Sequence, residues 1–64
     1  MTNLTAKDVD VLCHILTAEE MACKKARIYA NTLTDAALAQ EMERIAAAHA
    51  ERFSALYTIL GGKA

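Results

Sequence analysis

The feature that most constrains this chain is that it has only one place to turn between its two ends. No proline occurs among the 64 residues, and both glycines, Gly61 and Gly62, are adjacent near the C-terminus. The internal turn formers cluster in the segment Asn31-Thr32-Leu33-Thr34-Asp35. Because nothing else would break a helix, we expect an all-α fold of two long helices joined as an antiparallel hairpin.

Signals at the ends of the two segments set the boundaries that we expect. The segment Thr5–Asp8 fits a capping arrangement, in which the Thr5 hydroxyl can bind the amide three residues on and Asp8 is favourable at the positive end of the helix. The first helix should span about residues 5–31, the turn about 31–35 and the second helix about 35–60. Residues 1–64 then form a single helical-hairpin domain.

Each predicted helix carries one broad apolar face on a helical wheel. The faces comprise Val9, Val11, Leu12, Ile15, Leu16, Ala18, Ala22, Cys23, Ala26, Tyr29, Ala30 and Leu33 on the first helix, and Leu38, Met42, Ile45, Ala46, Phe53, Leu56, Tyr57 and Leu60 on the second. Because each helix covers only one side of the other, a lone hairpin leaves much of these faces in water. We therefore expect a homodimer that buries both faces in a four-helix bundle.

Two polar residues interrupt these apolar faces. Glu19 lies near the middle of the first face and His49 near the middle of the second. Counting from the turn places them within about 3 Å of the same level, so that they could meet in the core. A buried carboxylate needs a partner, and an imidazole is a suitable one. We predict a buried pair of Glu19 and His49; if it is only structural, leucine in place of Glu19 should be tolerated or stabilising, provided that His49 keeps a hydrogen-bond partner.

The same two residues are weak candidates for a metal site. A dimer would bring together two carboxylates of Glu19 and two imidazoles of His49, which could hold one iron, zinc or manganese ion. Cys13 and Cys23 do not add to such a site, since ten residues on one helix separate them by about 15 Å. That distance also excludes an intrachain disulfide. We interpret the cysteines as small buried apolar residues in a reducing compartment, with an interchain disulfide as the alternative.

Charge and hydropathy exclude two classes of partner. The net charge is -1 with both signs interspersed, so no basic stripe is present that would bind nucleic acid. No apolar run approaches the roughly 18 residues of a membrane span, and residues 1–8 do not resemble a secretion signal. We therefore expect a soluble cytoplasmic protein that binds neither nucleic acid nor membrane.

Two short segments resemble the ferritin-like superfamily, especially small hairpin members such as the spore coat protein F-like group and rubrerythrin-like halves. The segments are Thr17-Ala18-Glu19-Glu20 and Ala46-Ala47-Ala48-His49-Ala50-Glu51-Arg52-Phe53. In that superfamily a glutamate on one helix faces a Glu-x-x-His motif on the next, and doubling the hairpin completes a di-iron centre. The resemblance implies that Glu19 matches the first ligand and His49 the motif histidine. Because Ala46 replaces the bridging glutamate, it also implies a degenerate site.

The favoured hypothesis is a non-enzymatic structural or assembly protein, similar to spore coat proteins, without a cofactor and cytoplasmic or spore-associated. The sequence contains no catalytic nucleophile with its base, no phosphate loop and no complete metal motif. The first alternative is a metal-binding or vestigial redox protein that uses Glu19 and His49 across a dimer. The second is an adaptor that docks helices of another protein through Met21 and Ile28, which would be accessible on a monomer.

Overall fold

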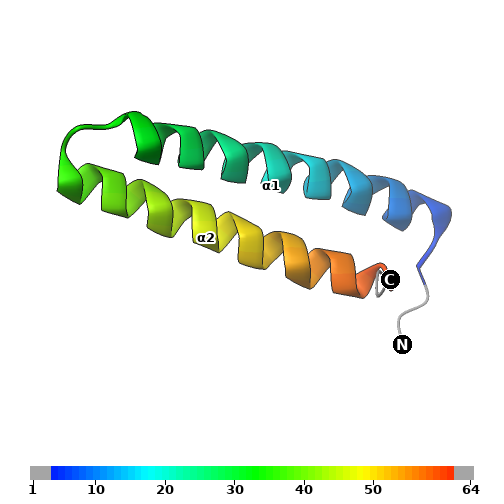
Figure 1. Ribbon diagram of the computed structural model, residues 1–64. Coiled ribbons are helices and arrows are strands. Elements are labelled where there is room, and N and C mark those ends of the chain that lie inside the picture. Colours follow the sequence, from blue (N-terminus) through cyan, green and yellow to red (C-terminus); the bar gives the residue numbers. More distant parts are fainter. Residues whose placement is uncertain (1–3, 62–64) are drawn as a thin grey trace.

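The computed structural model describes residues 4–61 and contains two long helices. Helix α1 spans Ala6–Thr32 and helix α2 spans Ala36–Ile59. They lie side by side and antiparallel, so that the beginning of α1 and the end of α2 are at the same end of the molecule (Figure 1). No strand occurs in this part of the chain. The predicted all-α hairpin is confirmed.

Both helices begin at the side-chain caps that the sequence indicates. The Asp8 amide donates to Thr5 Oγ1 at 3.0 Å, and the Thr5 amide donates to Asp8 Oδ2 at 3.1 Å. The predicted Thr5 cap is thus present, and the Asp8 carboxylate completes it as a reciprocal capping box. At the start of α2, Asp35 Oδ1 accepts a hydrogen bond of 2.9 Å from the Leu38 amide. The two helices are therefore delimited by local polar chemistry, independently of how they pack.

Helix α2 ends next to a glycine in the left-handed region. Gly61 has φ +76°, a conformation that other residues rarely adopt, and its amide donates to the carbonyl of Thr58 at 2.9 Å. Gly62, the other half of the predicted stop, lies outside the described residues.

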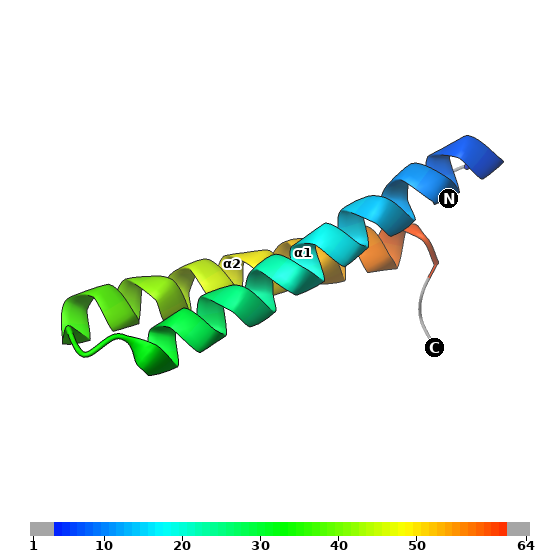
Figure 2. The same ribbon diagram turned by 90° about the horizontal axis from the view of Figure 1, so that it is seen from above.

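The helices meet along a narrow seam whose positions alternate three and four residues apart, the spacing of paired helices. Figure 2 shows the resulting shallow crossing of α1 over α2. The seam positions, all buried or half-buried, are Leu12, Leu16, Glu19, Cys23, Ala26 and Ala30 on α1, and Ala39, Met42, Ala46, His49, Phe53, Leu56 and Leu60 on α2. Among the described residues only Leu16, Ala26, Ala30 and Ala46 are buried apolar side chains. Because three of these four are alanines, the hairpin by itself has a very small core.

Much of the predicted apolar surface stays in contact with water. The molecule is a rod of 46 × 17 × 16 Å, and a second layer of large apolar side chains runs along it outside the seam. Those at least 38% exposed are Val9, Val11, Ile15, Met21, Ile28, Tyr29, Leu33, Leu38, Ile45, Tyr57 and Ile59. Neither helix, over the residues described, has the length and apolar character needed to cross a membrane.

The interpretation of both cysteines as buried residues is wrong for Cys13. Its side chain is exposed, whereas Cys23 is half-buried in the seam. The reason is that Cys13 lies one residue beyond the seam position Leu12, which turns it about 100° away from α2.

Candidate polar site in the helix seam

The structure brings the two predicted polar residues into direct contact. Glu19, near the middle of α1, and His49, near the middle of α2, lie at the same level of the seam. His49 Nδ1 is 2.5 Å from Glu19 Oε1, and the two side chains are only 22% and 16% exposed. Each helix therefore places one member of the pair, and packing along the seam aligns them.

A third residue, Arg52, completes the site and was missed from the sequence. Its Nε donates to Glu19 Oε2 at 3.0 Å, so both oxygens of the carboxylate are bound. The Arg52 side chain is 55% exposed and comes from α2, three residues after His49. That spacing places the side chains of Arg52 and His49 next to each other on the helix surface. It is the feature of the sequence from which Arg52 could have been predicted as part of the site. We call Glu19, His49 and Arg52 the polar cluster.

In the hydrogen bond between His49 and Glu19, the imidazole is the donor and the carboxylate is the acceptor. The hydrogen bond from His49 lowers the pKa of Glu19 below its ordinary value of 4.5, and Arg52 lowers it further, while partial burial opposes them. Glu19 is thus ionised at neutral pH, and the Nδ1–H of His49 donates to it. Because that nitrogen then has no free lone pair, Arg52 Nη2, 2.9 Å away, is a close neighbour of His49 and not its donor.

Acidification should remove the stabilisation that the Glu19 carboxylate provides. A folded-state pKa below the unfolded value means that the contribution is fully present above about pH 4.5 and is lost as the pH falls through the folded pKa. We expect the melting temperature of the wild-type protein to fall more between pH 7 and pH 3 than that of Glu19→Gln. Thermal unfolding followed by circular dichroism measures this difference.

The matched control is Glu51→Gln, which removes an exposed carboxylate from α2. This variant should keep the full acid sensitivity of the wild-type protein. Equal pH dependence in Glu19→Gln and the wild type would contradict the assignment of an ionised Glu19 to the polar cluster.

A single hairpin does not by itself assemble a metal site within the described residues, and the site across a dimer stays a prediction. Within residues 4–61, no three side chains of His, Cys, Asp or Glu lie close enough together to hold a metal ion. Ala46 offers no ligand at the bridging position, and the guanidinium of Arg52 binds one oxygen of Glu19. Nor does this part of the chain leave any buried side-chain polar atom without a partner. The cluster supplies its own cation through Arg52.

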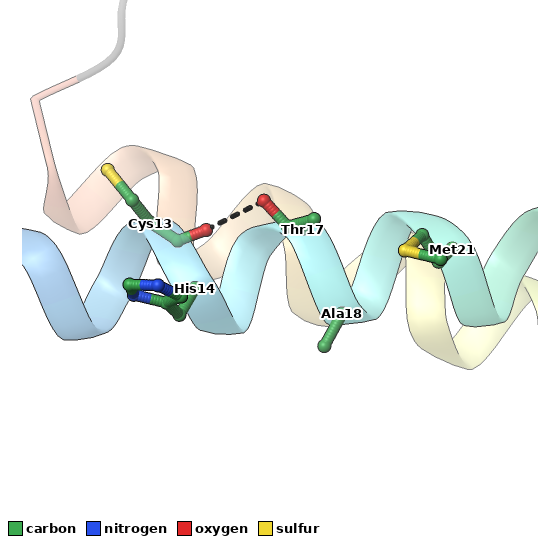
Figure 3. A pocket seen from close by; sticks show the side chains of 5 residues that line it. All are labelled: Cys13, His14, Thr17, Ala18 and Met21. Atoms are coloured by element: carbon green, nitrogen blue, oxygen red, sulfur yellow. Dashed lines mark hydrogen bonds between the residues drawn. The ribbon is translucent and has the colours of Figure 1, made fainter.

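A hollow on the surface of α1 adds no chemistry to that of the polar cluster. Figure 3 shows this hollow, which is formed by α1 alone, with α2 behind it, and is lined by Cys13, His14, Thr17, Ala18 and Met21. In it Thr17 Oγ1 donates to the carbonyl of Cys13 at 3.0 Å, a bond within one helix. The imidazole of His14 contacts the carbonyl of Asp10 at 2.8 Å. These are ordinary contacts of an exposed helix surface.

Comparison with protein-family models, with curated proteins and with solved structures gave no match. The resemblance to the ferritin-like superfamily therefore stays a prediction that depends on the two short segments around Glu19 and His49. The function of the hairpin is therefore inferred from its own surface and from the polar cluster.

Proposed function

We propose that this chain is a non-enzymatic structural or assembly protein whose working unit is a homodimeric four-helix bundle, similar to spore coat proteins. The observation that carries the proposal is the mismatch between its core and its surface. Within residues 4–61, one leucine and three alanines are buried, while large apolar side chains such as Ile15 and Ile45 remain 39% and 38% exposed. Chains of this size seldom fold stably on so little buried apolar surface, and oligomerisation is a common remedy.

The exposed area supports a partner of similar size. A compact monomer of 6.9 kDa is expected to expose about 4,000 Å². This hairpin exposes 4883 Å², a surplus of roughly 900 Å². Each partner in a standard protein interface loses about 800 Å². The surplus is therefore close to what one such interface would cover.

The remaining parts of the proposal follow from charge and from the resemblance. A net charge of -1 gives no reason to expect binding to nucleic acid. The resemblance to spore coat proteins favours a cytoplasmic or spore-associated location. The Arg52–Glu19 contact favours an assembly role over the metal-binding alternative, because a metal ion would have to displace the guanidinium from the carboxylate.

Sedimentation analysis and metal analysis of one untagged sample test this function. We expect a particle of two chains, each of 6.9 kDa, without stoichiometric metal. A compact, stably folded single chain in dilute solution would contradict the dimer and favour an adaptor docking through Met21 and Ile28, both 60% exposed. Stoichiometric iron, zinc or manganese that is lost in His49→Ala would instead support the metal-binding alternative.

A further inference from the structure

The two sides of the hairpin flanking the seam differ sharply in character. On one side, Arg27 of α1 binds Glu43 of α2 at 3.3 Å, and the same side carries Glu20 and Lys24, which pair at 3.3 Å. A hollow on this side is lined by Glu20, Lys24 and Ser54 and also by Cys23, Ala50 and Phe53, so both helices contribute to it. We call this the polar side.

Across the seam lies a side on which large apolar side chains predominate between Val11 and Tyr29 of α1 and between Leu38 and Ile59 of α2. On α2, every seventh position from Leu38 to Ile59 falls on it, and only Arg52 among the four is polar. On α1, the corresponding positions lie on the flank opposite Glu20 and Arg27. Val11 and Ile59 line one hollow there together with Lys7 and Asp8 near the start of α1, which places them on the same side of the molecule. The apolar face consists of Val11, Ile15, Ala22, Tyr29, Leu38, Ile45 and Ile59, and its large side chains are 38–55% exposed.

The polar cluster lies at the centre of this apolar face. Glu19 is midway along α1, which spans Ala6–Thr32, and His49 is close to the middle of α2, which spans Ala36–Ile59. Apolar side chains extend from the cluster towards the turn, as Ile45 and Tyr29 do, and towards the open end. The Arg52 side chain, which is 55% exposed, interrupts the stripe between Ile45 and Ile59.

We infer that two copies of the chain mate through the apolar face, with the polar cluster of one copy stacked on that of the other. This inference rests on the proposed homodimer and specifies its surface. When a two-fold axis at the centre of the face relates two copies, the middle of one hairpin lies against the middle of the other. This holds whether the two copies run parallel or antiparallel. Because the clusters occupy that level, each copy contributes one carboxylate and one guanidinium to a single polar layer.

The charges of such a layer balance. Each copy brings the negative Glu19 and the positive Arg52, so stacking two clusters buries no net charge. The carboxylate of one copy also gains a second guanidinium nearby, which is the complementarity that a self-associating surface needs. A partner with a purely apolar groove would leave Arg52 buried with fewer acceptors, and a second copy therefore suits this face better.

A charge-exchange experiment tests the stacking directly. Glu19→Arg gives a chain with two guanidinium groups in the cluster, and Arg52→Glu gives a chain with two carboxylates. Either variant alone should dimerise poorly, because four like charges would meet in one layer. Mixing the two restores the balance, and the mixed dimer should form at least about tenfold more tightly than either variant with itself, equivalent to ~1.4 kcal/mol. Sedimentation gives the dissociation constants, and native mass spectrometry distinguishes the three dimers by mass.

The matched control exchanges charge on the polar side. Arg27→Glu and Glu43→Arg alter an ion pair that also joins the two helices, but one that faces away from the proposed interface. Each control variant should dimerise as the wild type does, and mixing them should give statistical proportions of the dimers.

The outcomes separate the inference from the function on which it depends. A wild-type protein that never dimerises removes the proposed function. A wild-type dimer combined with no preference for the mixed dimer of Glu19→Arg and Arg52→Glu overturns only the stacking. The stacking is also overturned if the two variants are unfolded alone and stay unfolded when mixed, because a polar layer with balanced charges should restore the bundle. A preference shown instead by the Arg27 and Glu43 variants would assign the interface to the polar side.

Discussion

Replacing Leu16 by alanine should lower the free energy of unfolding by about 2–5 kcal/mol. Leu16, at 9% exposure, is the one large side chain among the buried apolar residues of the part of the chain that the structure describes. Its truncation removes apolar area and leaves a space that the three buried alanines cannot fill. Because a chain of this size seldom has more than about 3–5 kcal/mol of stability from a single core, Leu16→Ala should lose most of its helical content at ambient temperature.

Met21→Ala is the matched control for this prediction. Met21 also lies on α1, but its side chain is 60% exposed and faces away from both the seam and the apolar face. Its truncation should change the free energy of unfolding by less than about 0.5 kcal/mol. Urea unfolding followed by circular dichroism, at equal chain concentrations, gives both values. If the two variants lost the same stability, Leu16 would not be part of a packed seam.

The fold could be predicted because its determinants are local. Thr5 and Asp8 cap one helix and Asp35 caps the other through contacts with residues three positions away, which a sequence displays directly. The single turn between Thr32 and Ala36 left one way to connect them. The exposure of Cys13 follows from its position beside the apolar face rather than on it, which a prediction from residue type alone ignores.

The candidate site could be predicted in part. Glu19 and His49 stand out because polar residues are unusual on apolar faces, and their common level follows from counting along two helices. Arg52 did not stand out, because a long basic side chain on a helix flank is common and reaches a partner by bending. Its contact with Glu19 depends on side-chain conformation, which helical periodicity does not specify.

Arg52 also changes the expected effect of replacing Glu19. On the sequence alone, leucine at this position removes a buried charge and should be tolerated. With Arg52 present, Glu19→Leu leaves the guanidinium without its carboxylate and His49 without its acceptor. We therefore expect tolerance only when all three residues of the polar cluster are replaced by apolar ones, because no unpaired polar group then remains.

Replacing Ala46 by leucine should lower the free energy of unfolding by about 1–3 kcal/mol. Ala46 is 0% exposed and lies in the seam of α2 three residues before His49. Adding three carbon atoms there forces the helices apart or the new side chain into an unfavourable rotamer. Ala47→Leu is the matched control: its neighbouring position is exposed, alanine and leucine have similar helix propensities, and its stability should change by less than about 0.5 kcal/mol.

The contrast between these two variants also bears on the ferritin-like resemblance. A bridging glutamate at position 46 would be longer than leucine and charged, so a seam closed tightly around alanine cannot accept it without separating the helices. If Ala46→Leu is as stable as Ala47→Leu in urea unfolding, the seam has room for a larger side chain. The polar cluster would then be better described as a ferritin-like site from which only the glutamate at position 46 is missing. If Ala46→Leu is destabilised as expected, the close approach of α1 and α2 at Ala46 is itself a feature of this hairpin, and the polar cluster is built around it.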